Sequence, residues 1–232
     1  MKTKIFMDGA SLEDMLKLKN EPFISGFTTN PTLMKKAGVT DFEPYCRNIL
    51  KVITDMPMSF EVFADDYEEM KRQAHKITSW GKNVYVKIPI MNTKGISSIP
   101  LIKELSAEGI KLNITAMMTV EQVKNVVNAV SKTTSTFVSV FAGRIADTGI
   151  DPLPIMKECL EVVKTNPMAE LLWASPREVF NLYQAEEIGC HIITMAPDLL
   201  SKLNLKGKSL DEFSLETVQM FYNDAVKVGF KL

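Results

Sequence analysis

Short apolar runs alternate with longer stretches of helical periodicity along the whole chain of 232 residues. Runs rich in β-branched and aromatic residues predict strands, and apolar positions that recur every three or four residues predict helices. We expect eight strands, at residues 4–7, 26–28, 58–63, 84–88, 112–116, 136–140, 170–173 and 191–194. Helices are expected to alternate with them, at residues 12–19, 41–55, 66–80, 98–108, 119–131, 152–164, 177–188 and 198–203.

Local signals mark some of the helix starts. Ser11 is followed three residues later by Asp14, which is a spacing typical of a capped N-terminus. Pro176 is expected in the first turn of the helix at 177–188, because a proline needs no hydrogen-bond acceptor for its nitrogen there.

Eight β-then-α units predict an α/β protein that forms a closed (β/α)8 TIM barrel, because parallel strands need crossover helices and eight strands close the sheet. An open doubly wound sheet is the alternative. It is disfavoured because no glycine-rich phosphate loop follows the first strand, where the sequence reads DGAS (8–11). We expect one domain over residues 1–232, with 214–228 as an additional C-terminal helix outside the repeat.

Charge and composition exclude several classes of function. With 27 basic and 28 acidic residues the net charge is −1, so we expect no nucleic-acid partner. No apolar run is long enough to cross a bilayer and the start lacks a signal-peptide core, so we expect a cytoplasmic protein without membrane contact. Three scattered cysteines and two distant histidines lack the spacing of metal ligands, so no metal site is expected.

The strand at 84–88 carries a lysine, Lys87, within the apolar run VYVKIP (84–89). A lysine in such a place needs a charged partner, a route to water, or a chemical role. Desolvation disfavours the charged form of an amine, and a free amine attacks a carbonyl carbon to form a Schiff base. The alternative is a lysine at the end of an edge strand, without a catalytic role.

Other polar side chains stand near the ends of the expected strands, where the active sites of barrel enzymes lie. Besides Lys87 they are Asp8, Thr28, Asn30, Glu61, Asn113, Thr115, Ser139, Arg144, Ser175 and Arg177. One amine, two carboxylates, several hydroxyls and amides, and two arginines are therefore expected at the same mouth of the barrel.

Several of these residues also have purely structural interpretations. Asp8 could cap the first helix, and the residues after Thr28 could form a turn whose Pro31 opens a helix. Asn113 and Thr115 lie two apart and face the same side of their strand, so they could satisfy one another inside the barrel.

The two arginines raise the question of an anion. Arg144 could pair with Asp147, and Arg177 could be a solvated residue at the start of its helix. A cation at a helix N-terminus opposes the helix dipole unless an anion lies between them. Ser175 together with the two arginines therefore predicts a pocket for a phosphate or sulfonate group.

Five ordered motifs carry a family resemblance: TTNPTL (28–33), VKIP (86–89), NIT (113–115), SVFAGR (139–144) and ASPR (174–177). By these motifs, which are spread over most of the length, the chain resembles the transaldolase family and in particular its short members. The resemblance implies a (β/α)8 barrel, a lysine that forms a Schiff base, and no metal or organic cofactor.

The resemblance implies a role for each catalytic candidate. Lys87 would attack C2 of a ketose phosphate, such as sedoheptulose 7-phosphate or fructose 6-phosphate. Asp8 would take the proton of the C4 hydroxyl as the C3–C4 bond breaks. Glu61 and Thr115 would hold a water molecule that moves protons while the carbinolamine forms and dehydrates.

The same resemblance implies residues that bind a small sugar phosphate. Asn30, Asn113 and Ser139 are expected at the dihydroxyacetone unit, Arg144, Ser175 and Arg177 at the distal phosphate, and Thr28 and Phe141 complete the set.

The family also contains fructose-6-phosphate aldolases, which release dihydroxyacetone instead of passing it to an aldose phosphate. Those enzymes tend to have glutamine and tyrosine where Glu61 and Phe141 stand, so we expect transfer here. Aldol release and a sulfosugar substrate are the alternatives. Gly9, Pro176 and Glu178 depart from the family pattern, which leaves a non-catalytic barrel that binds sugar phosphates as a further alternative.

Oligomeric state is implied by the resemblance as well. Short members of the family often form decamers built from pentamers, with the C-terminal helix lying on a neighbour. Phe213, Phe221 and Phe230 would suit such packing, so we expect a homo-oligomer.

Overall fold

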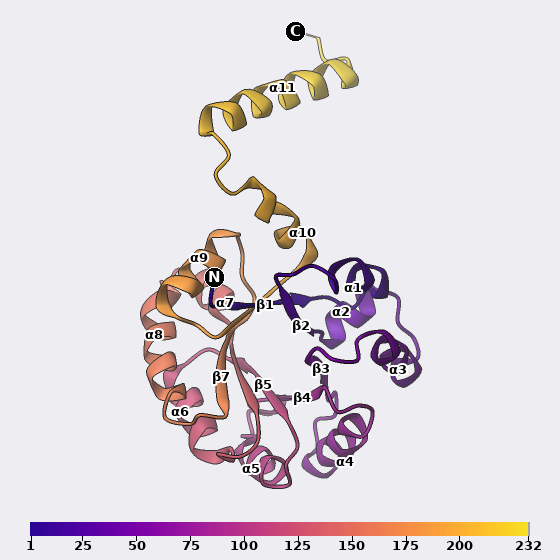
Figure 1. Cartoon of the computed structure of the whole chain (residues 1–232), viewed down its shortest axis with the longest axis vertical. Helices are drawn as coiled ribbons and strands as arrows, with labels where there is room; N and C mark the ends of the chain where they lie inside the picture. Colours follow the sequence, from indigo (N-terminus) through magenta and orange to yellow (C-terminus); the bar gives the residue numbers. More distant parts are fainter. Residues whose placement is uncertain (232) are drawn as a thin grey trace. The chain divides into compact units, whose positions relative to one another are not determined.

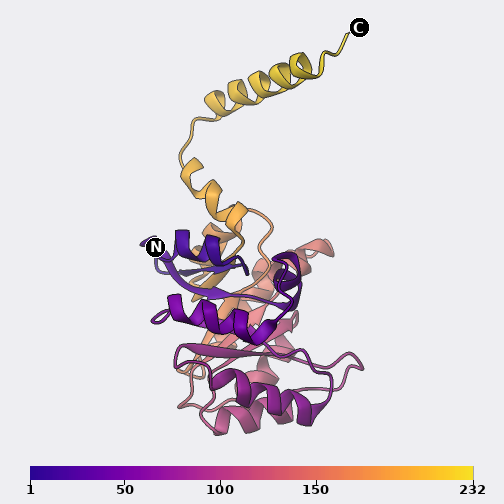
Figure 2. The same cartoon turned by 90° about the vertical axis from the view of Figure 1, so that its right-hand side faces the viewer.

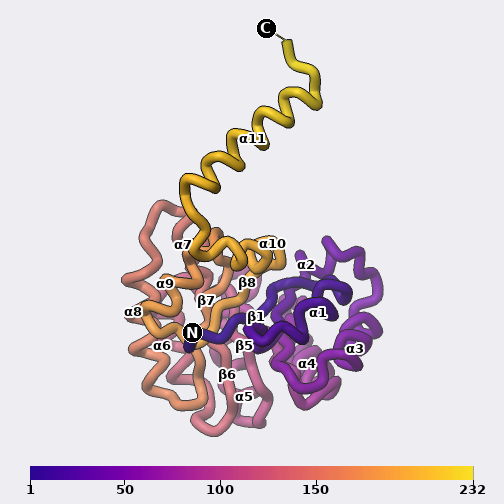
Figure 3. The backbone as a smooth tube through the Cα atoms, turned by 45° about the horizontal axis from the view of Figure 1, so that its top comes forward, coloured from indigo at the N-terminus to yellow at the C-terminus, as the bar shows by residue number. Residues whose placement is uncertain are grey.

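Eight parallel strands close into a barrel in the computed structural model, which describes residues 1–231. The strands pair in sequence order (Figure 1), and Figure 3 shows β8 next to β1, with which it pairs to complete the ring. The strands are β1 (Lys4–Asp8), β2 (Ile24–Thr28), β3 (Met58–Glu61), β4 (Val84–Pro89), β5 (Leu112–Met117), β6 (Thr136–Val140), β7 (Ala169–Trp173) and β8 (Ile192–Met195). The predicted (β/α)8 barrel is confirmed.

Helices α1 to α9 connect consecutive strands and lie around the outside of the barrel (Figure 1), and α10 follows the last strand. They are α1 (Leu12–Leu18), α2 (Pro31–Lys36), α3 (Phe42–Val52), α4 (Tyr67–Thr78), α5 (Ile99–Ala107), α6 (Val120–Ala129), α7 (Ala142–Asp147), α8 (Pro152–Val163), α9 (Phe180–Ile188) and α10 (Pro197–Leu200). The prediction for Pro176 is wrong, because α9 begins only at Phe180 and the proline precedes it.

Side chains that cap the helices fix where the loops leave the barrel. The Ser11 hydroxyl accepts a hydrogen bond from the Asp14 N–H at 3.2 Å and caps α1. Asp8 is therefore not the cap of this helix. Asn30 caps α2 in the same way, by accepting from the Leu33 N–H at 3.0 Å.

The interior of the barrel has an aromatic layer beneath a polar one. Tyr85 stacks on Phe137 with ring centroids 4.0 Å apart, and Phe6 meets Phe137 edge-on at 5.5 Å. Two residues further along their strands, Phe6 is followed by Asp8 and Tyr85 by Lys87, and this spacing keeps both side chains on the inner face. The aromatic rings thus close the barrel below the polar carboxyl ends of the strands.

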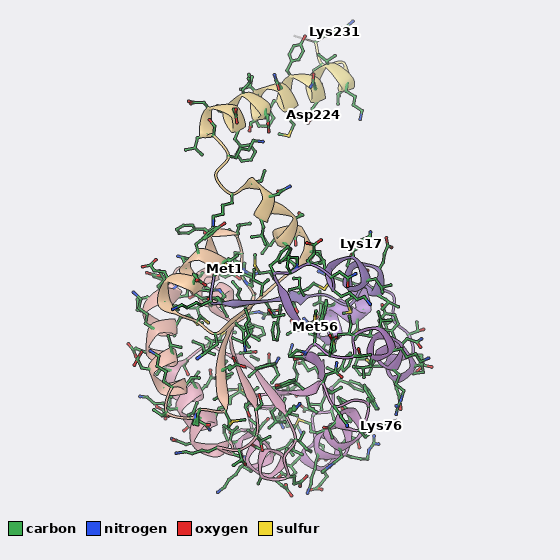
Figure 4. The ribbon with its side chains drawn as sticks, viewed as in Figure 1. Met1, Lys17, Met56, Lys76, Asp224 and Lys231 are labelled. Carbon is green, nitrogen blue, oxygen red and sulfur yellow. The ribbon has the colours of Figure 1, made fainter. Side chains whose placement is uncertain are left out.

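A second compact unit begins at Ser201. It contains the 3-10 helix η1 (Ser201–Leu205) and α11 (Leu210–Val228), which Figure 2 shows as separate helical segments. The C-terminal helix predicted at 214–228 thus starts four residues earlier. No residue of α11 is buried, and in Figure 4 side chains, Asp224 among them, project from this helix.

Among residues 1–231, no helix combines the length and the apolar character needed to cross a bilayer.

Gly26 makes room for the aromatic layer, and an alanine there should destabilise the barrel. A Cβ at this position would lie 2.7 Å from Cζ of Phe6, inside a packed ring cluster. We expect Gly26→Ala to lower the free energy of unfolding by about 1–3 kcal/mol, because overpacking forces the ring to move. Urea unfolding measures this loss, and adding Phe6→Leu should recover part of it.

Gly9→Ala is the matched control for this prediction. A Cβ at Gly9 would meet the flexible end of Met7, which can turn away. We expect little change in stability there. A Gly26→Ala variant as stable as the unmodified protein would contradict the account of the aromatic layer.

Candidate active site

Lys87 lies on β4 with its side chain inside the barrel, and only 6% of the residue is exposed. Its Nζ donates a hydrogen bond to the backbone carbonyl of Thr29 at 3.0 Å and lies 3.2 Å from Oε2 of Glu61. A buried amine therefore has a carboxylate within proton-transfer distance. The edge-strand interpretation is wrong, because β4 pairs with β3 on one side and β5 on the other.

Glu61 reaches Lys87 because the two residues are directly opposite in the β3–β4 pair. The Glu61 side chain is 17% exposed. β3 ends at Glu61, and Phe63 lies outside with 62% of its surface exposed. The predicted strand at 58–63 is therefore too long. Glu61 is the last residue of the observed strand, and its side chain faces the inside of the barrel.

Asp8 ends β1 at the same mouth of the barrel. Its Oδ1 accepts a hydrogen bond from the Thr28 hydroxyl at 2.7 Å, and Thr28 is its register partner on β2. Burial raises the pKa of Asp8 above its ordinary value, although the Lys87 amine and the Thr28 hydrogen bond act in the opposite direction. The site thus holds a carboxyl group that takes up a proton more readily than an exposed aspartate.

Asn113 is fixed on both sides by hydroxyl groups. Its Oδ1 accepts from the Ser139 hydroxyl at 2.6 Å, and its Nδ2 donates to Oγ of Ser59 at 3.0 Å. Thr115 takes no part in this network, so the expectation that Asn113 and Thr115 satisfy one another is wrong. Within the described part of the chain, the buried Oγ1 of Thr115 has no hydrogen-bond partner.

The turns after β6 and β7 pack tightly against one another. A Cβ on Gly143 would lie 1.6 Å from the carbonyl oxygen of Ser175, so the start of α7 tolerates no side chain there. Ser175 adopts a left-handed backbone conformation with φ +59°. The Arg144 guanidinium lies 5.4 Å from the ring centroid of Phe141. Arg144, Phe141 and Ser175 are thereby gathered at one side of the mouth.

Arg177 is held differently from Arg144. Its Nε donates to Oδ1 of Asp147 at 3.1 Å, and its NH2 group donates to Oδ2 of the same carboxylate. The side chains of this pair are about half exposed. The pairing of Arg144 with Asp147 is therefore wrong, and Asp147 binds the other arginine.

One cavity of about 130 Å³ joins most of these residues. Its lining contains Asp8, Thr28, Asn30, Lys87, Asn113, Thr115, Ser139, Phe141, Arg144 and Ser175, all of which the sequence predicted. Glu61 and Arg177 are not part of the lining, although Glu61 contacts the lining residue Lys87.

Three lining residues were missed by the sequence prediction: Leu172 from β7, Ala174 directly after β7, and Thr194 from β8. Thr194 carried a usable signal, because it is the last residue of a predicted strand and is polar. The two apolar residues gave none, since any strand of the barrel contains such side chains.

The three cysteines of the chain are free and buried. Burial raises the pKa of Cys46, Cys159 and Cys190 to about 12, so these thiols stay protonated at neutral pH. Among the residues that the structure describes, no cluster of three histidine, cysteine or acidic side chains is placed to hold a metal ion.

The cavity and its surroundings bring together a buried amine, two carboxyl groups and a guanidinium group. Lys87, Asp8 and Arg144 line the same cavity, and Oε2 of Glu61 lies 3.2 Å from the Lys87 amine. Such a site can bind a carbonyl compound covalently and move protons on either side of the bond formed.

Solved structures of other proteins support the barrel fold. The chain superposes on KGPDC from Streptococcus mutans with a TM-score of 0.58 at 11% identity, covering 84% of this chain and 88% of that one. It superposes on the tryptophan synthase A-subunit of Pyrococcus furiosus with a TM-score of 0.60 at 10% identity, covering 91% and 94%. At these identities the likeness concerns the fold alone.

Sequence comparisons are more specific. The chain is 34% identical over 201 residues to a probable transaldolase 2 of Listeria monocytogenes, which covers 86% of this chain and 88% of the relative. It is 32% identical over 230 residues to a probable transaldolase of Thermoanaerobacter, which covers 99% and 100%. The sequence model described as transaldolase/fructose-6-phosphate aldolase matches residues 5–232. The chain therefore belongs to the transaldolase/fructose-6-phosphate aldolase family.

Proposed function

We propose that the protein is a transaldolase, which transfers a dihydroxyacetone unit from a ketose phosphate to an aldose phosphate through a Schiff base on Lys87. The observation that carries the proposal is the buried Lys87 amine, 3.2 Å from Glu61, in a cavity that also contains Asp8. Family membership supports the reaction class.

The first half of the reaction joins the donor to the enzyme. Glu61 accepts a proton from the Lys87 ammonium, and the free amine attacks C2 of the ketose to give a carbinolamine. Loss of the C2 oxygen as water then gives a protonated imine. The unpartnered hydroxyl of Thr115 lies in the same cavity and can hold the water that carries these protons.

The second half breaks and remakes a carbon–carbon bond. Asp8 takes the proton of the C4 hydroxyl, C4 becomes an aldehyde, and the electrons of the C3–C4 bond move to the imine nitrogen. The resulting enamine stays on Lys87 until an acceptor aldehyde enters. The steps then run in reverse, and Asp8 returns its proton to the new hydroxyl.

The phosphate of the donor is assigned to the side of the mouth that holds Arg144 and Ser175. The guanidinium of Arg144 is a planar fork of donors, which suits a phosphate group. Arg177 can join this contact only after leaving Asp147, to which it is bound by two hydrogen bonds.

Aldol release is the second candidate function, because the family contains both activities. Glu61 and Phe141 occupy the positions where we expect glutamine and tyrosine in releasing enzymes, and this favours transfer. Free dihydroxyacetone formed from fructose 6-phosphate without an acceptor would instead support release.

We also propose that the protein forms a homo-oligomer through α11. The helix has 19 residues and none of them is buried. Its exposed residues include the large apolar or aromatic side chains of Phe213, Val218, Phe221 and Tyr222. An exposed apolar surface of this kind is typical of an interface, and a second copy of the chain is the occupant that the family resemblance favours.

Reductive trapping tests the Schiff base. Borohydride added with fructose 6-phosphate should attach the sugar fragment to Lys87, as read by intact mass and peptide mapping. Lys87→Ala should trap nothing, while Lys111→Ala, at the opposite end of the barrel, should trap like the unmodified protein. An adduct that persists in Lys87→Ala refutes the proposal, and ligand binding without any adduct or turnover would support a non-catalytic barrel.

Arg144→Gln tests the phosphate assignment. We expect KM for fructose 6-phosphate to rise about tenfold or more, the size expected for a lost charge-assisted hydrogen bond. KM for unphosphorylated fructose should change little. Arg72→Gln, on the outer surface of α4, is the control. Equal rises for both sugars would contradict the assignment, and a preference for the 6-sulfonate analogue would point to a sulfosugar.

Sedimentation tests the role of α11. The chain has a mass of 26.0 kDa, and we expect a species several times larger. Val218→Lys with Phe221→Lys should shift the population toward the monomer, whereas Lys231→Ala should not. A monomer in the unmodified protein would contradict the oligomer proposal.

A further inference from the structure

Thr194 lines the cavity from β8, and the reaction described above assigns it no role. It is 5% exposed, and its Oγ1 lies 2.5 Å from Oγ1 of Thr28. Thr28 in turn contacts Oδ1 of Asp8 at 2.7 Å. The three side chains form an unbroken hydrogen-bonded chain that ends on the catalytic carboxyl group.

The direction of this chain follows from the number of available protons. A hydroxyl group has a single proton to donate, and an ionised carboxylate can only accept. When Asp8 is ionised, Thr28 must give its proton to Asp8, as the contact is oriented in the structure. In the short contact between the two threonine hydroxyls, Thr194 is then the donor and Thr28 is the acceptor.

The topology of the barrel explains how Thr194 on β8 can contact the hydrogen-bond partner of Asp8, which lies on β1. β1 lies between β2 and β8, with Asp8 opposite Thr28 and Phe6 opposite Thr194. The hydroxyls of Thr28 and Thr194 therefore meet across the strand that carries Asp8. Thr194, on β8, is the member of this hydrogen-bonded series that lies farthest along it from Asp8.

We propose that Thr194 is a positioning residue, which holds Thr28 in the orientation that donates to Asp8 and so keeps the Asp8 carboxylate ready to take the C4 hydroxyl proton. This inference rests on the proposed function, in which Asp8 acts only in the cleavage and formation of the carbon–carbon bond. It predicts an effect on that step and not on the formation of the Schiff base.

The electrostatics of Asp8 give the proposal a pH signature. Burial raises the pKa of Asp8, the charge of Lys87 and the Thr28 hydrogen bond lower it, and the charge of Glu61 raises it. Hydrogen bonds in a chain polarise one another, so loss of Thr194 weakens the Thr28 contribution. The pKa of Asp8 then rises further. Because the ionised form is needed, the acidic limb of the pH–rate profile moves to higher pH.

Two substitutions at position 194 separate the hydroxyl from the shape of the side chain. Thr194→Val keeps the shape and removes the hydroxyl, whereas Thr194→Ser keeps the hydroxyl. For cleavage of fructose 6-phosphate we expect Thr194→Val to lose about tenfold in kcat, with KM changed less than about threefold. Its acidic limb should move to higher pH, while Thr194→Ser should stay close to the unmodified enzyme in both respects.

Trapping with dihydroxyacetone separates this inference from the proposed function. Borohydride should trap the dihydroxyacetone adduct on Lys87 equally in the unmodified enzyme and in Thr194→Val, because that step does not use Asp8. Thr136→Val, which removes another buried hydroxyl from the amino end of β6, is the matched control and should leave kcat unchanged.

Each contrary outcome has a distinct meaning. An unshifted pH profile and unchanged kcat in Thr194→Val overturn the role of Thr194, and so does Thr194→Ser behaving like Thr194→Val. Loss of trapping in Thr194→Val alone also overturns it, because the hydroxyl would then serve Lys87 or the fold. Absence of trapping in the unmodified enzyme overturns the proposed Schiff base instead.

Discussion

The burial of one amine governs the arrangement of the site. Lys87 is enclosed by the barrel, and its Nζ contacts Glu61 and the carbonyl of Thr29. Breaking a buried ion pair by removing one partner costs several kcal/mol, on the order of 3–5, because it leaves an uncompensated charge. The β3–β4 register therefore has to place Glu61 opposite Lys87, and that requirement ties the fold to the proposed chemistry.

Along β1 and β4, inward-facing positions alternate between the aromatic layer and the polar cavity. Phe6 and Tyr85 form the aromatic layer with Phe137, while Asp8 and Lys87, two residues further along, reach the cavity. The buried rings of this layer lie on the same strands as Asp8 and Lys87, two residues before them. The geometry of the strands thus places buried aromatic side chains in one layer and polar side chains of the cavity in the next layer.

Most of the fold could be predicted from the sequence, because eight β-rich runs separated by helical patterns leave few alternatives. Ten of the predicted site residues line one cavity, since the ends of parallel strands converge. The orientation of Arg177 could not be predicted, because its partner Asp147 lies on α7, a short helix with a weak signal. Thr194 was missed although it is the polar last residue of a predicted strand, and its contact with Thr28 across β1 could not be read from the sequence.

The proposed function requires Lys87 to react with the C2 carbonyl of the donor inside the cavity. Carbon-13 NMR of the protein with dihydroxyacetone labelled at C2 observes that atom directly, without a reducing agent. We expect a bound resonance of an imine, enamine or carbinolamine carbon that is present in the unmodified protein and absent in Lys87→Met. A C2 signal that remains that of a free ketone, or a covalent signal that survives in Lys87→Met, would contradict it.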